Sequence, residues 1–172
     1  MKLNKSDFEF RLCTPEDFEE ILSLQDEAFA LLDDSDILRK NTNDMLLSCL
    51  NEPQITLGAF YKGELAAFSV LYFPEGSEAL APYLKTVDAK GKKDANNKLC
   101  IVKNKFRGNG LQSTLGLMLE KYAKEKGIDL LCATVSPKNK YSMNNMKKMG
   151  YTYDSTTEKY GGLERNIYYK FI

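Results

Sequence analysis

Residues 102–112 read Val-Lys-Asn-Lys-Phe-Arg-Gly-Asn-Gly-Leu-Gln and join a short apolar run at 99–102 to an amphipathic segment at 111–126. The glycines Gly108 and Gly110 allow a ligand to approach the backbone closely. The first amides of a helix lack intrahelical partners and carry the positive end of its dipole, so they bind anions. Ser113 breaks the dinucleotide fingerprint, and no Walker lysine follows the glycines. The loop alone therefore indicates either an anion site or a tight turn.

Hydrophobic periodicity predicts regular elements on both sides of this loop. Strands are expected at 8–12, 55–61, 64–73, 99–102, 128–135, 151–154 and 165–172, and helices at 18–29, 42–50, 111–126 and 139–149. The resulting order, β-α-α-β-β-β-α-β-α-β-β, is typical of an α/β domain built round a mixed sheet.

The length and composition predict one domain over residues 1–172. Residues 74–97 are polar and lysine-bearing, and their only apolar patch lies at 80–84. A connection of this length without strong periodicity is usually functional, so we expect an insertion or lid.

Composition also excludes several classes of protein. Lys plus Arg and Asp plus Glu are both 24, so the net charge is zero, which disfavours nucleic acid as a partner. Without histidine the chain is neither a Ser-His-Asp nor a Cys-His hydrolase, and no metal is expected. The polar start and the absence of a long apolar run predict a cytoplasmic protein with no membrane partner. The four separated cysteines are expected to be buried thiols.

Two motifs together resemble the GNAT superfamily of N-acyltransferases. Its acyl-CoA signature is Arg/Gln-x-x-Gly-x-Gly/Ala after a strand, and Arg107 and Gly110 match it, whereas Gln112 replaces the final small residue. The second feature is a strand followed by Asn-x-x-Ala/Ser and a helix ending in Gly-Phe/Tyr. Here it is Asn139 to Ser142, with Gly150 before a tyrosine. The resemblance covers nearly the whole chain in element order.

The resemblance implies that the strands at 99–102 and 128–135 splay apart and receive acetyl-CoA, with no metal. The backbone amide of Val102 is expected to polarise the thioester carbonyl. The cofactor-binding residues expected are Cys100, Ile101, Val102, Arg107, Gly108, Asn109, Gly110, Leu111, Gln112, Ser113, Asn139, Ser142 and Asn145.

The chemistry implied is direct attack of a primary amine, from a small molecule or a peptide, on acetyl-CoA. Met146 stands where the family often has a tyrosine that acts as the general acid. Tyr141 or Tyr153 is therefore the alternative acid, and the sequence does not single out a general base. Candidate acceptor-binding residues are Asp33, Asp34 and Tyr160, with Arg165 near the last turn. The alternative function is a non-catalytic acyl-CoA sensor, and both a monomer and a homodimer are compatible with the sequence.

Overall fold

A computed structural model describes all residues of the chain, 1–172. The strands are β1 (Glu9–Leu12), β2 (Ile55–Tyr61), β3 (Glu64–Tyr72), β4 (Asp94–Val102), β5 (Leu130–Val135), β6 (Thr152–Lys159) and β7 (Leu163–Phe171). The helices are α1 (Phe18–Ala30), α2 (Asn43–Ser48), α3 (Leu111–Glu125) and α4 (Lys140–Lys148). The order of elements along the chain is the expected one, and the α/β class is confirmed.

All seven strands belong to one mixed sheet with the order β1-β2-β3-β4-β5-β7-β6. Only β4 and β5 are parallel, and every other neighbouring pair is antiparallel. A parallel pair needs a crossover connection, and α3 supplies it. The two halves of the sheet therefore meet at the β4–β5 pair.

Two strand boundaries differ from expectation by more than two residues. β4 begins at Asp94, inside the segment 74–97 expected as an insertion, and β6 runs to Lys159 rather than ending at residue 154. The first half of β4 contains two asparagines, and asparagine has low strand propensity. The side chain of one of them, buried Asn96, is held in place because its Nδ2 donates to the Glu78 carbonyl oxygen at 2.8 Å. β6 is an edge strand that pairs with β7 alone and needs no apolar alternation.

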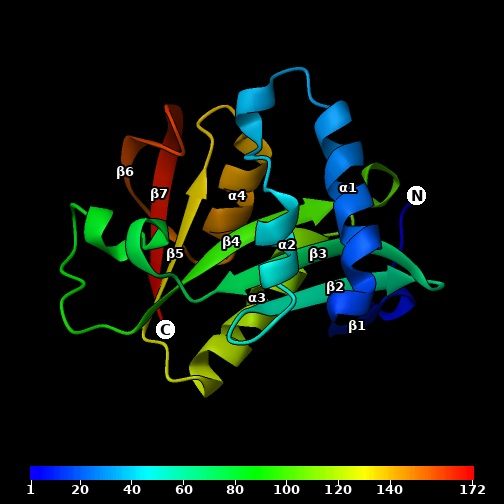
Figure 1. Cartoon of the computed structure of the whole chain (residues 1–172), viewed down its shortest axis with the longest axis horizontal. Helices are drawn as coiled ribbons and strands as arrows, with labels where there is room; N and C mark the ends of the chain where they lie inside the picture. The colour runs from blue at the N-terminus through cyan, green and yellow to red at the C-terminus, as the bar shows by residue number, and fades with distance from the viewer.

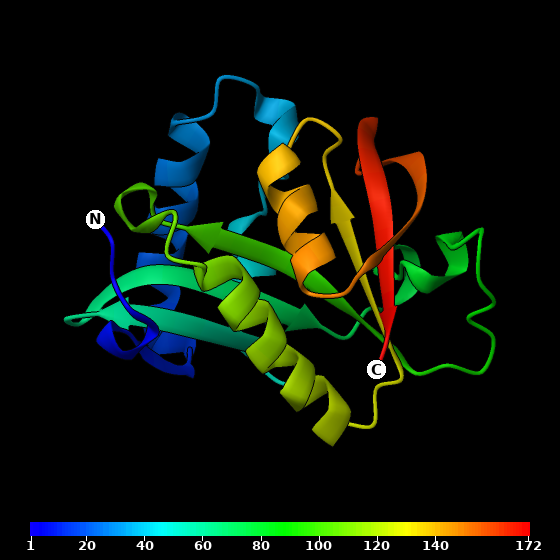
Figure 2. The ribbon, with the colours of Figure 1, turned by 180° about the vertical axis from the view of Figure 1, so that it is seen from behind.

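Helices cover both faces of the sheet. α1 and α2 lie on the face turned towards the viewer in Figure 1, and α3 and α4 lie on the opposite face, which Figure 2 shows from behind. The connection between β3 and β4 extends beyond the sheet at the side of β5 to β7 in both views. Its Leu80 is buried against Leu130 and Cys132, so the expected apolar patch anchors it.

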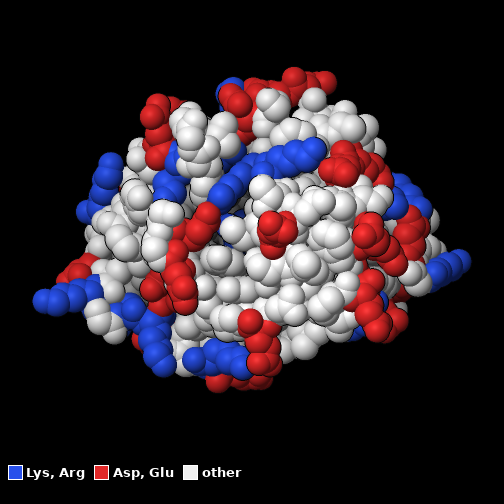
Figure 3. Space-filling view, in the orientation of Figure 1, with Lys and Arg blue, Asp and Glu red and all other residues white.

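Charged side chains of both signs are interspersed over the face shown in Figure 3, in keeping with the net charge of zero. No helix combines the length and the apolar character that a membrane crossing requires.

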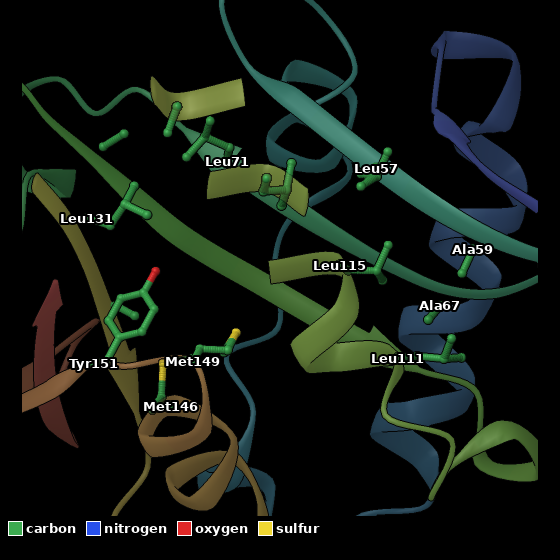
Figure 4. Close-up of a cluster of buried hydrophobic side chains, with 14 of the residues drawn as sticks. Leu57, Ala59, Ala67, Leu71, Leu111, Leu115, Leu131, Met146, Met149 and Tyr151 are labelled. Carbon is green, nitrogen blue, oxygen red and sulfur yellow. The ribbon is translucent and has the colours of Figure 1, made fainter. Parts of the chain in front are cut away.

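The larger core lies between the sheet and the helices α3 and α4. Figure 4 shows Leu111 and Leu115 of α3 pointing at the sheet, with Met146 of α4 and Met149, directly after that helix, beside Tyr151. Leu115 has no exposed surface. A second core lies under α1 and α2 around Phe68. This packing fixes the start of α3, and with it the glycine loop, against the end of β4.

Candidate active site

The sheet opens between β4 and β5. These strands pair only over Asp94–Asn96 with Leu130–Cys132. On its other edge β4 pairs Asn97 with Leu71 and Leu99 with Val70, which leaves Lys98 as an extra residue. Such a bulge bends the strand that carries it. The bend comes directly after the last paired residue, so the remainder of β4 diverges from β5.

A cavity of about 410 Å³ extends from this gap to the glycine loop. Its walls come from β4, the start of α3, the start of α4 and the segment after α1. They include most of the expected cofactor-binding residues, namely Cys100, Ile101, Val102, Arg107, Gly108, Leu111, Gln112, Asn139 and Ser142, together with Tyr141.

The glycine loop leaves a row of backbone donors free. The amides of residues 108–113 donate to no acceptor within the chain, and the first helical bond runs from the Thr114 amide to the Gly110 carbonyl oxygen. Gly108 and Gly110 have φ of +82° and +71°, and a Cβ at either would meet nothing within 4 Å. Free amides at the positive end of a helix in open space fit an anionic phosphate group.

The free edge of β4 offers further donors. The Lys103 amide donates to the Ala66 carbonyl oxygen of β3 at 2.8 Å. Because successive N–H groups of a strand point to opposite edges, the Val102 N–H points into the gap. Burial raises the pKa of the Cys100 thiol to about 12, so this thiol stays protonated at neutral pH and is no nucleophile.

A chain of polar side chains joins α3 to α4. Gln112 Oε1 accepts from Asn145 Nδ2 at 2.8 Å, and Gln112 Nε2 donates to the Ser142 hydroxyl at 3.4 Å. Asn139 caps α4, since its Oδ1 accepts from the Ser142 amide at 3.0 Å. Gln112, the departure from the family signature, therefore has a structural reason: its long side chain bridges the two helices that flank the cavity.

Four of the expected cofactor-binding residues line neither cavity, namely Asn109, Gly110, Ser113 and Asn145. The side chains of two of them are bonded elsewhere. Asn109 Oδ1 accepts from the Leu3 amide at 2.8 Å and its Nδ2 donates to the carbonyl oxygens of Met1 and Phe106. The Ser113 hydroxyl donates to the Gly110 carbonyl oxygen at 3.4 Å. These side chains organise the loop, and only their backbone amides are available to a ligand.

A smaller cavity of about 110 Å³ adjoins the first on the side of β5 and β7. The two cavities share Ile37, Leu38, Cys100, Gln112, Asn139 and Ser142. The smaller one also contacts Met146, Tyr160 and three cationic residues, Arg39, Lys98 and Arg165. None of the residues lining either cavity is Asp, Glu or His.

Glu78, from the β3–β4 connection, binds two of these cations. Arg39 Nη2 and Nη1 donate to its carboxylate at 2.9 and 3.1 Å, and Lys98 Nζ donates at 2.9 Å. The Arg39 contact, the larger cause, and the Lys98 contact lower the pKa of Glu78 to about 2. This carboxylate is therefore ionised and fully engaged at neutral pH. The Arg39 guanidinium also stacks on Tyr160, 3.9 Å from the ring centre.

Of the acceptor-binding candidates Asp33, Asp34 and Tyr160, only Tyr160 lines a cavity. Tyr160 lines the smaller cavity, and its hydroxyl lies 3.1 Å from the Thr134 hydroxyl. Asp33 and Asp34 line neither cavity, and Asp34 instead accepts from Lys138 Nζ at 2.6 Å. Among the acid candidates, Tyr141 is at the rim and half exposed, whereas the Tyr153 hydroxyl is bonded to Thr156 outside both cavities.

Sequence reasoning missed Arg39, Glu78, Asn97 and Lys98. Arg39 follows the acidic loop after α1, Glu78 lies in the connection expected as a lid, Lys98 is the bulged residue of β4, and Asn97 precedes it and lines the smaller cavity. None of these positions belongs to a recognisable motif. The only signal at Arg39, Glu78 and Lys98 was their charge, which many surface side chains share, and Asn97 gave no signal.

A family model and several solved structures agree with this geometry. The family model described as Acetyltransferase (GNAT) family matches residues 16–151. The chain belongs to the GNAT acetyltransferases. The resemblance seen in the two motifs is thereby confirmed. GNAT acetyltransferases use acetyl-CoA, and no cluster of three His, Cys, Asp or Glu residues here could hold a metal ion.

Several solved GNAT structures share the fold. A Streptococcus pneumoniae acetyltransferase of the GNAT family has a TM-score of 0.69 and 20% identity, covering 96% of this chain and 99% of that one. The ribosomal-protein-S18-alanine N-acetyltransferase of Escherichia coli has a TM-score of 0.71 and 15% identity over 96% and 94% of the two chains. Salmonella typhimurium yncA, solved with its cofactor acetyl-CoA, gives 0.70 and 15% over 96% and 94%. No curated protein sequence matches significantly.

Proposed function

We propose that this GNAT acetyltransferase transfers the acetyl group of acetyl-CoA to a primary amine by direct attack. The observation that supports it is the pair of adjoining cavities that meet at Cys100, one reaching the free amides of residues 108–113 and the other lined by polar side chains. We further propose that residues 1–172 form one domain, in which Glu78 of the β3–β4 connection binds two of the cations that line the smaller cavity.

Each wall of the larger cavity has a role in this proposal. The amides of residues 108–113, with Arg107 beside them, bind the pyrophosphate. The free edge of β4 from Cys100 to Val102 and the Asn139 side chain hold the pantetheine arm. Acetyl-CoA supplies an activated acetyl group as a thioester. The Val102 N–H, which points into the gap, donates to the thioester carbonyl oxygen and favours the charge that develops there.

The side chains that line the cavities determine which groups can transfer protons. Because no Asp, Glu or His lines them, the amine is deprotonated by water before it attacks. A leaving thiol with a pKa near 8.5 departs without obligatory protonation, and Tyr141 at the rim is the remaining side-chain donor. Met146, in the smaller cavity, has no transferable proton.

The absence of Asp, Glu and His from the walls of both cavities also supports a second candidate, a non-catalytic acyl-CoA sensor, because a binding module needs no base. Release of free CoA thiol from acetyl-CoA, measured against small-molecule amines and peptides with free amino termini, separates the two. Turnover above the rate of spontaneous hydrolysis on any amine supports the transferase. Tight CoA binding in calorimetry without turnover on the whole panel would establish the sensor instead.

A further inference from the structure

The smaller cavity carries an excess of positive charge. Arg39, Lys98 and Arg165 line it, and the one carboxylate that bonds to any of them is Glu78, which engages Arg39 and Lys98. Three cations against one anion leave two positive charges uncompensated. This is unusual locally, since the whole chain has a net charge of zero.

Arg165 of β7 is the member of this group without an ionic partner. The residue is only 3% exposed. Its Nη1 donates to the Glu164 carbonyl oxygen at 2.9 Å, and its Nη2 is buried with no hydrogen-bond partner. A guanidinium stays charged in proteins, and a buried donor without an acceptor is costly. The free Nη2 of Arg165 is therefore a site prepared for an anionic acceptor atom.

The acids nearest the cavity do not fill this role. Asp34 and Asp36, in the loop between α1 and α2, both approach Lys138 Nζ, at 2.6 and 3.8 Å. The guanidinium of Arg39 is bonded to Glu78 and stacked on Tyr160, and these two contacts hold it beside the cavity. Arg165 thus faces one further cation, Arg39, and the phenol of Tyr160, while Asp36 acts on it only through space, without a hydrogen bond or ion pair. An anion that bonds directly to Nη2 has to arrive with a ligand.

We propose that the acceptor is a small amine that also carries a carboxylate, as free amino acids do, and that Arg165 binds that carboxylate. The proposal rests on the proposed function, since it names the acceptor class of the same site. A cavity of about 110 Å³ suits a group of a few non-hydrogen atoms. A carboxylate accepts from Nη2 at one oxygen and leaves the second oxygen for neighbouring donors.

The test compares free amino acids with their carboxamides as acceptors, which removes the carboxylate charge. Because this change also lowers the pKa of the amine, kcat/KM is expressed per unprotonated amine. We expect kcat/KM of the wild type to be about 10- to 100-fold higher for the acids, the range given by one charge-assisted hydrogen bond. Arg165→Gln should abolish this preference while CoA affinity stays unchanged. Arg11→Gln, which removes an arginine already paired with Asp17, should retain it.

Equal rates on acids and carboxamides, or an undiminished preference in Arg165→Gln, would overturn the inference. A preference for phosphoethanolamine or for acidic peptides over free amino acids would overturn the assignment of a small carboxylate. If no amine is acetylated, the proposed function fails, and calorimetry of amino acid against carboxamide on the CoA complex still decides the role of Arg165. Weaker binding of the carboxamide by wild type alone supports it, and equal binding refutes it.

Discussion

Replacing Gly110 with aspartate tests directly whether the amides of residues 108–113 hold a phosphate. Gly110 has φ of +71°, and a Cβ there meets nothing within 4 Å, so the new side chain fits without a clash. Aspartate is one of the residues that adopts left-handed backbone conformations, and the cost to the fold is about 1 kcal/mol. Its carboxylate stands beside the free amides, where it repels a phosphate and competes with it for donors.

The size of the effect follows from the exposure of the loop. Two unit charges 4 Å apart interact by about 1 kcal/mol in water and about 4 kcal/mol at an effective dielectric constant of 20. Gly110 is exposed, between the cavity-lining residues Gly108 and Leu111, so the interaction energy lies between these limits. The Kd for CoA should therefore rise by about tenfold to several hundredfold, with the smaller effect at high salt.

Calorimetric titration with CoA measures this shift, and two variants control it. Gly110→Asn adds a similar volume without the charge, and should lose much less affinity. Gly63→Asp places the same residue at φ of +82° in equally open space, in the turn between β2 and β3. Its CoA affinity should equal that of the wild type. If Gly110→Asp binds CoA within threefold of the wild type, the loop does not hold the phosphate.

Three further outcomes are expected. Val102→Pro removes an N–H that makes no bond to β3. Thiol release should slow by about 100-fold or more, and CoA affinity should fall by much less, because the glycine loop still binds the pyrophosphate; unaltered turnover would exclude this amide. The profile of log kcat/KM against pH should rise with a slope of one and follow the pKa of whichever amine is used, whereas a midpoint independent of the amine would reveal a base on the protein. The pKa of Glu78 is about 2 in the folded protein against 4.5 ordinarily. Because the carboxylate is partly exposed and screened by solvent, it stabilises the fold above pH 4.5 by about 1 to 2 kcal/mol, and this contribution is lost as the pH falls towards 2. Denaturant unfolding of wild type and Glu78→Gln at pH 7 and pH 3 should show a smaller pH dependence in the variant, and equal dependence would contradict the ion pairs.

The elements with strong periodicity could be predicted closely from sequence. The expected helix at 111–126 is observed as Leu111–Glu125, with its apolar face against the sheet. β4 and β6 were expected too short for one physical reason. Their outer parts are polar, and pairing with neighbouring strands holds them in the sheet instead of an apolar pattern of their own.

The same distinction applies to the site. The free amides of the glycine loop and the Asn139 cap are local features, which a short stretch of sequence determines. The group around Glu78 is assembled from the segment after α1, the β3–β4 connection and the bulge in β4. Its members are distant in sequence, and a bulge of one residue leaves no periodic signal. The position of Lys98 could therefore be known only from the register of β4 on β3.

The opening after Asn96 gives the sheet two edges in its interior, in addition to those of β1 and β6. Unpaired strand edges are templates on which other chains can aggregate. Here residues of α3, α4 and the segment after α1, such as Gln112, Ser142 and Leu38, stand around the opening. Only a ligand about as narrow as one extended chain can reach the unpaired backbone groups. The geometry that keeps these groups available to a slender cofactor thus also keeps strands of other chains from pairing with the two inner edges.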